Sequence, residues 1–170
     1  MKKALFVAAI AVLGILAWAD PVVDGKVSAR EYAHTQAVID GAAVLNWAGD
    51  GQGGLYLSLT AKTKGWAAVG LGSQKMAGAY IYIGYVGADG KAVFSEQVAK
   101  GHRHTESGKK TADKSVVTLT KGTTVLEFHI PAKDLPFTGK TVPFVTAFSD
   151  AADLVTFHND SIDSGTFTFP

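Results

Sequence analysis

A thioether and several imidazoles are the groups in this sequence best suited to bind a soft or borderline metal ion. The chain has two methionines, Met1 and Met76, and five histidines. Met76 lies in a polar, glycine-flanked segment, Gly72–Ala79, where a core residue is not expected; a flexible methionine that folds inward as core filler is the alternative. His158 follows the apolar run Leu154–Phe157, and its alternative is a surface or capping histidine.

Two further histidines form an H-x-H pair, His102 and His104, within the sequence GHRHTE. In an extended segment, residues i and i+2 point to the same side, so both imidazoles and the Glu106 carboxylate would lie together. Two histidines and a carboxylate suit zinc or copper. The pair therefore predicts a second, separate metal site, with a solvated loop as the alternative.

The composition excludes several kinds of chemistry. The chain has no cysteine, which rules out disulfides, thiolate metal sites, a cysteine nucleophile and covalently attached c-type haem. The near-equal counts of 16 basic and 15 acidic residues argue against nucleic acid as a partner, because phosphate binding needs a clustered basic surface. No G-x-S-x-G motif is present, and Gly70-Leu71-Gly72 lacks the following helix of a phosphate-binding loop.

The N-terminal residues have the pattern of a signal peptide. Lys2 and Lys3 are followed by the apolar run Ala4–Leu16 and by Ala17-Trp18-Ala19, which fits an A-x-A cleavage site. We therefore predict a signal peptide at residues 1–19, a mature domain at residues 20–170, and a periplasmic or extracellular location. An uncleaved anchor is the alternative, but the run is shorter than the ~20 residues that span a membrane. No later segment approaches that length, and Met76 would be the only methionine of the mature chain.

Short β-rich runs separated by glycine and turn residues make up the remainder of the chain. They predict an all-β, single-domain antiparallel β-sandwich of the immunoglobulin-like kind. Gly87–Gly90 and Lys121-Gly122 are expected to form hairpin turns. Residues 28–31 and 133–135 are expected to form short helical turns, and residues 100–114 a long loop. The expected strands are residues 55–61, 66–71, 79–86, 91–98, 116–119, 125–130, 142–148, 154–157 and 166–169.

His129 belongs to one of these expected strands. In the run VLEFHI it shares a face with Glu127, while Leu126 and Phe128 point to the other side. The polar character of the first face predicts that it is the wetter one.

Several motifs follow one another along the chain in a recognisable order. The most specific of them are the tryptophan-containing run Gly65–Gly72, the segment Met76–Ala79 that follows it, and Phe157-His158 near the end. The others are Val23–Lys26, Glu31-Tyr32, Trp47, Gly54–Leu57 and Val145–Phe148. This ordered set resembles the DOMON domain, an extracytoplasmic β-sandwich module of haem- and sugar-binding proteins.

The resemblance implies a cofactor and its ligands. In cytochrome-type members of this family, one methionine and one histidine hold a b-type haem, and these correspond to Met76 and His158. Because cysteine is lacking, the haem would be bound non-covalently. A haem ligated by two side chains suits electron transfer with a redox partner protein rather than catalysis on a substrate.

Aromatic residues would line the haem slot under this interpretation. Trp66, Tyr80 and Phe157 are the expected walls, with Trp47 and Tyr82 as further candidates. Lys75 or Arg103 could contact the haem propionates. Two other functions stay open: a carbohydrate- or small-ligand-binding module without haem, which would use exposed Tyr and Trp side chains, and a structural sandwich of the cell surface.

Overall fold

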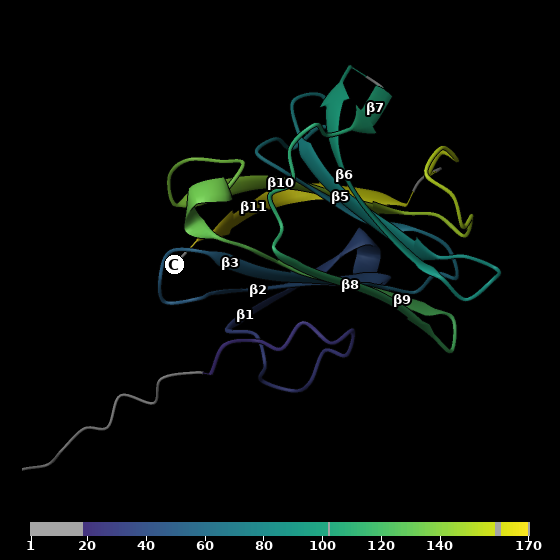
Figure 1. Cartoon of the computed structure of the whole chain (residues 1–170), viewed down its shortest axis with the longest axis horizontal. Helices are drawn as coiled ribbons and strands as arrows, with labels where there is room; N and C mark the ends of the chain where they lie inside the picture. The colour runs from purple at the N-terminus through teal and green to yellow at the C-terminus, as the bar shows by residue number, and fades with distance from the viewer. Residues whose placement is uncertain (1–18, 102, 159–160, 170) are drawn as a thin grey trace, which may run out of the picture.

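Two antiparallel β-sheets packed face to face form the protein, which confirms the predicted β-sandwich (Figure 1). The computed structural model describes residues 19–101, 103–158 and 161–169. The first sheet has the strand order β1-β2-β3-β9-β8, with β1 (His34–Val38), β2 (Ala43–Gly49), β3 (Leu55–Ala61), β8 (Lys114–Thr120) and β9 (Thr123–Ile130). The second has the order β11-β10-β4-β5-β6-β7, with β4 (Ala67–Leu71), β5 (Tyr80–Val86), β6 (Ala92–Lys100), β7 (Arg103–Glu106), β10 (Thr141–Phe148) and β11 (Ile162–Thr168).

Helical structure in the described residues is limited to two 3₁₀ turns, η1 (Ile39–Gly41) and η2 (Ala132–Asp134). The second of these corresponds to the helical turn expected at residues 133–135. No helix in this part of the chain has the length and apolar character needed to cross a bilayer.

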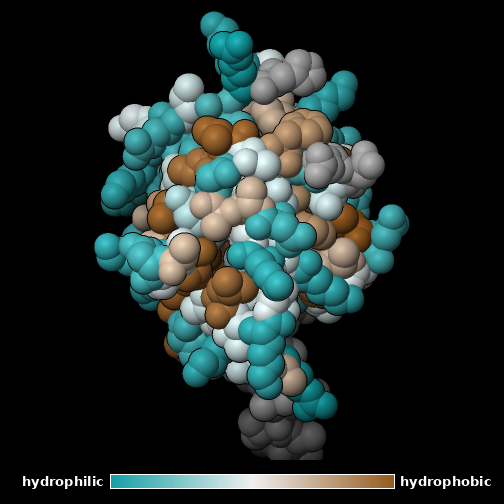
Figure 2. All heavy atoms as spheres, turned by 90° about the vertical axis from the view of Figure 1, so that its right-hand side faces the viewer, coloured by the Kyte–Doolittle hydropathy of each residue, from teal (hydrophilic) through white to brown (hydrophobic). Residues whose placement is uncertain are grey.

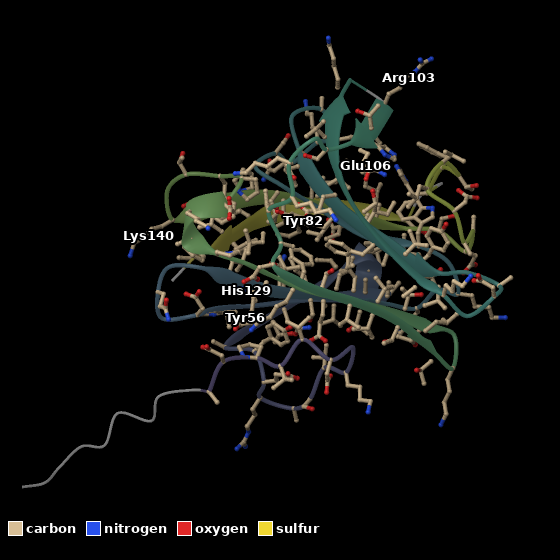
Figure 3. The ribbon with its side chains drawn as sticks, viewed as in Figure 1. Tyr56, Tyr82, Arg103, Glu106, His129 and Lys140 are labelled. Carbon is tan, nitrogen blue, oxygen red and sulfur yellow. The ribbon has the colours of Figure 1, made fainter. Side chains whose placement is uncertain are left out.

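The main hydrophobic core lies between the sheets and follows from strand alternation. Side chains such as Val69 and Leu71 of β4 point inward, and Tyr82 of β5 is fully buried. The Tyr82 ring stacks on Phe128 of β9, with ring centroids 4.2 Å apart. Figure 3 shows Tyr82 in the space between the two sheets.

The outer face of the second sheet is also apolar. A second cluster of buried residues, which we call the outer cluster, lies there: Trp66, Ala68, Ala79, Ile81, Ile83, Val145 and Ala147. A sheet with one polar face would show alternation between apolar and polar side chains, and these strands do not. Met76 from the β4–β5 connection and Leu154 from the segment after β10 pack against this cluster.

The outer face of the first sheet is covered by the N-terminal segment, residues 20–33. Glu127 of β9 is fully buried there: its Oε2 accepts the Gly25 N–H at 2.7 Å and its Oε1 accepts the Tyr32 hydroxyl at 2.8 Å. His129 is buried on the same face, close to Tyr56, as Figure 3 shows. The expectation that this face is the wetter one was wrong, because a segment distant in sequence lies over it.

Replacing Glu127 with alanine should lower the free energy of unfolding by about 3 kcal/mol, because two buried donors lose their acceptor. Burial raises the pKa of Glu127 above its ordinary value. The folded state therefore holds this proton more tightly than the unfolded state, and stability falls as the pH rises through the raised pKa. Urea denaturation between about pH 4 and pH 8 should show this fall in the free energy of unfolding for the wild type. The Glu127→Ala variant should lack it.

The exposed Glu106 on β7 offers a matched control. The Glu106→Ala variant should differ from the wild type by no more than about 0.5 kcal/mol. Equal stabilities of the two variants would contradict the anchoring role of Glu127.

Two segments differ from their sequence-based expectations. Residues 100–114 are not one long loop, since β7 pairs with β6 in a hairpin. Residues 154–157 are not a strand: the Asp153 carboxylate accepts the N–H groups of Val155 and Thr156, at 2.8 Å and 2.6 Å, and so closes a turn. The turn places the residues after β10 over the second sheet instead of in it.

The hairpin turns at Gly87–Gly90 and Lys121-Gly122 lie where the sequence predicts them, between β5 and β6 and between β8 and β9. The Ser28–Glu31 motif forms a turn without a helix, in which Glu31 accepts the Ser28 N–H at 2.7 Å. The first two strands, β1 and β2, were not predicted.

Candidate functional site

A pocket opens on the outer face of the second sheet. It encloses about 130 Å³, enough for several water molecules or a part of a larger ligand. Small residues on β4 leave space for the pocket. A Cβ at Gly70 would come within 2.9 Å of the side chains of Ala79 and Val145. The other floor residues are Ala68 of β4, Ile81 and Ile83 of β5, and Ala147 of β10.

Met76 and His158 line this pocket from two different elements. Met76 lies in the connection between β4 and β5, and His158 lies in the segment that follows β10. Both side chains are partly buried. The structure thus brings together a thioether and an imidazole that are more than eighty positions apart in the sequence.

Trp66 and Phe157 line the same pocket, as the sequence predicted for walls of a binding slot. Trp66 is buried, whereas Phe157 is 64% exposed. Two further apolar residues at this pocket, Val155 and Ile162, are also exposed. Figure 2 shows hydrophobic side chains between hydrophilic ones on the face that forms the right-hand side of Figure 1.

Two hydrogen bonds from Trp66, one from its backbone and one from its side chain, hold the segment that carries His158. The Trp66 N–H donates to the Ala151 carbonyl at 3.0 Å, and the indole N–H donates to the Thr156 carbonyl at 3.1 Å. The first contact fixes the start of the segment and the second lies two residues before His158. The position of the imidazole therefore depends on this tryptophan.

The Trp66→Phe variant should loosen residues 151–158. It removes the indole N–H that Thr156 accepts, so the local opening free energy should fall by about 1 kcal/mol and amide hydrogen exchange should rise about fivefold there. Trp47→Phe is the matched control, because the Trp47 indole N–H donates to the Thr168 carbonyl at 3.1 Å, away from this segment. Equal exchange in the two variants would contradict the anchoring role.

The His158 ring has a buried nitrogen. Its Nδ1 is buried and has no hydrogen-bond partner among the described residues. A buried polar atom without a partner is costly, by about 1 to 3 kcal/mol.

His104 is a pocket residue that the sequence did not place there. On β7 it pairs with Ala99 of β6, and its Nδ1 is hydrogen-bonded to Gln97 Oε1. Burial lowers the pKa of His104, which favours the neutral ring. The H-x-H motif singled out this histidine, but only the strand order shows that it faces the same pocket as Met76.

Several other predicted residues lie elsewhere. Tyr80 points to the opposite side of the second sheet, where its hydroxyl donates to Glu96 Oε2 at 3.0 Å. Trp47 and Tyr82 belong to the core between the sheets. Lys75 is exposed and does not line the pocket.

The predicted second metal site is only partly described. His102 lies outside the described residues, as do residues 1–18 of the expected signal peptide. Arg103 and Glu106 extend from β7 at the top of Figure 3, and neither lines the pocket. Within the described part of the chain, no three His, Asp or Glu side chains are grouped so that they could hold a metal ion.

Comparisons with known proteins give a family and a fold. The family model described as "DOMON domain" matches residues 39–135, a range that includes Met76 and His104. No curated protein matches the chain in sequence.

Two solved structures share the fold at low sequence identity. The cytochrome b domain of pyranose dehydrogenase from Coprinopsis cinerea has a TM-score of 0.53 at 15% identity, covering 79% of this chain and 80% of that one. The cytochrome domain of cellobiose dehydrogenase from Myriococcum thermophilum also has a TM-score of 0.53, at 14% identity, covering 75% of each chain.

Proposed function

Because this chain belongs to the DOMON domain family, we propose that it binds one b-type haem non-covalently and exchanges single electrons with a redox partner protein. The observation that carries the proposal is that Met76 and His158 line one apolar pocket. The fold shared with two cytochrome b domains supports it.

The residues that line the pocket fit a b-type haem. A thioether and an imidazole are both ligands of haem iron in electron-transfer proteins, and here they come from two separate elements, Met76 before β5 and His158 after β10. Trp66 and Phe157 would contact the porphyrin; Tyr80 would not, because it faces the other side of the sheet.

A haem held by two side chains supplies reversible one-electron chemistry without an open coordination position. The protein's own part is to orient the haem and to exclude water from it. The floor of Ala68, Gly70 and Ile81 keeps the pocket apolar. The exposed Phe157 and Val155 form an apolar rim at which a redox partner would approach.

The sugar-binding alternative was expected to use exposed Tyr and Trp side chains as stacking platforms. None of the described Tyr and Trp side chains is exposed, and Trp47 and Trp66 are buried, at 8% and 5% exposure. The exposed aromatic ring at the pocket is that of Phe157.

A haem titration of the purified chain tests the proposal. We expect one haem per chain, and sharp α and β absorption bands on reduction, as six-coordinate haem with two side-chain ligands shows. The His34→Ala variant serves as a control, because His34 is an exposed histidine stacked on Trp47, and it should give the same spectrum. A chain that stays colourless after haem addition would overturn the proposal.

We further propose that the chain is exported to the periplasm or beyond, with cleavage after Ala19. The basic start, the apolar run and the A-x-A motif of residues 1–19 support this. N-terminal sequencing of protein recovered from the exporting host should begin at Asp20. A sequence that begins at Met1 would contradict it.

A further inference from the structure

We propose that His104 is a third ligand donor of this pocket, able to take the place of Met76 on bound iron through its Nε2. The inference rests on the proposed haem function and extends it, because Met76 and His158 account for only two donors. It stands on three features of the described residues: the position of His104, its hydrogen bond to Gln97 and the roles of the other histidines.

The position of His104 puts it beside the Met76 segment. Ala99 of β6 is the register partner of His104 across the β6–β7 pair. The same Ala99 also bonds the end of the Met76 segment: its carbonyl accepts the Gly78 N–H at 3.4 Å, and its N–H donates to the Ala79 carbonyl at 3.3 Å. His104 and Met76 therefore approach the pocket from neighbouring positions, whereas His158 comes from the segment after β10.

The hydrogen bond to Gln97 sets the tautomer of His104. Gln97 is buried; its Oε1 lies against His104 Nδ1, and its side-chain N–H donates to Ser95 Oγ at 3.1 Å. An amide oxygen only accepts, and the proton of the bond must come from Nδ1 of the imidazole. A neutral His104 consequently carries its lone pair on Nε2, which has no hydrogen bond from the described residues.

This arrangement is typical of metal-bound histidines, in which one ring nitrogen donates to a fixed acceptor and the other binds the metal. The burial that favours the neutral ring acts in the same direction, since a ligating imidazole must be neutral.

The other described histidines lack this arrangement, in which one ring nitrogen donates to a fixed acceptor and the other has no hydrogen bond. His129 is bonded at both nitrogens, to Asp113 at 2.7 Å and to Asp50 at 3.1 Å. His34 stacks on Trp47 and does not line this pocket. His158 shares the pocket but has no partner for its Nδ1 among the described residues. The Ser95–Gln97–His104 chain is thus the one built support for an imidazole ligand among the described residues.

The test compares variants of the haem-loaded protein by absorption and electron paramagnetic resonance. The Met76→Ala variant should remain six-coordinate and low-spin, with the signature of two imidazoles and a lower reduction potential, because an imidazole replaces the thioether. The Met76→Ala/His104→Ala variant should be high-spin. Met76→Ala/His34→Ala and Met76→Ala/His102→Ala are the matched controls, and both should stay low-spin.

The haem-free protein provides a second readout. Imidazole nitrogen NMR should show His104 protonated at Nδ1, and the Gln97→Ala variant should lose that preference. A proton on Nε2 in the wild type would overturn the inference whether or not haem binds.

The outcomes separate the two proposals. If the wild type is low-spin and the Met76→Ala variant is high-spin, His104 is not a donor, and the haem function stands. If low-spin character is lost only with the His102 substitution, the neighbouring histidine is the donor and the inference is wrong. If the wild type binds no haem, both proposals fall.

Discussion

Replacing His158 with alanine should convert low-spin haem in the wild-type chain to a high-spin form. The variant loses the only imidazole that reaches the pocket from the segment after β10 in the described chain, and His104 lies on the Met76 side. Haem affinity should fall by more than the roughly 10- to 100-fold that loss of an outer-shell partner costs, because the variant lacks the proposed direct ligand. Absorption spectra and haem transfer to a competing apoprotein measure the two effects.

Two controls belong with this variant. His34→Ala removes an exposed imidazole outside the pocket and should change neither measurement. Circular dichroism should show that His158→Ala keeps its sheet content, since the side chain lies outside every strand. A low-spin spectrum in His158→Ala would mean that this histidine is not a ligand.

Replacing Gly65 with alanine should be the most destabilising small substitution near the site. A Cβ at this position would overlap the carbonyl oxygens of Ser149 and Ala151. The residue cannot move away easily, because its own carbonyl accepts the Thr124 hydroxyl at 2.9 Å and its N–H donates to Thr63 Oγ1 at 3.1 Å. We expect a loss of about 3 kcal/mol, or about 10 °C in melting temperature.

The same overlap would displace the start of the segment that carries His158, so haem affinity should fall together with stability. Gly108→Ala is the matched control: a Cβ there meets no atom within 4 Å, and the backbone has no left-handed φ. It should melt within about 2 °C of the wild type. Equal melting temperatures for the two variants would show that the close approach at Gly65 can relax.

The strands that the sequence predicted share one property, which is a clear local boundary. β5 and β6 meet at Gly87–Gly90, and β8 and β9 meet at Lys121-Gly122, where Lys121 and Gly122 both have positive φ. A two-residue turn of this kind is encoded by its own residues. These two hairpin positions were accordingly predictable.

The missed strand β2 lacks such a local pattern. β2 is buried on both faces, by the opposite sheet and by the N-terminal segment, so its side chains do not alternate between apolar and polar. The burial of Glu127 has the same origin, because it depends on Tyr32 and Gly25, about a hundred residues away. Neither covering contact can be read from the strand that it covers.

The inventory of chemical groups was determined by the sequence alone. With no cysteine and with Met76 as the only methionine beyond Met1, any soft ligand had to be this thioether, and any haem had to be bound without thioether bonds to the chain. Residue type and two-residue alternation are local properties, so the β-sandwich could be predicted with them.

Only the tertiary structure decided which imidazoles accompany that thioether. Met76, His104 and His158 come from three elements, and the strand order β10-β4-β5-β6-β7 brings those elements to one face of one sheet. Strand order is set by pairing between residues far apart in the chain, which no local pattern specifies. The H-x-H motif of His102 and His104 therefore predicted a separate site, whereas the fold directs His104 into the pocket of Met76 and His158.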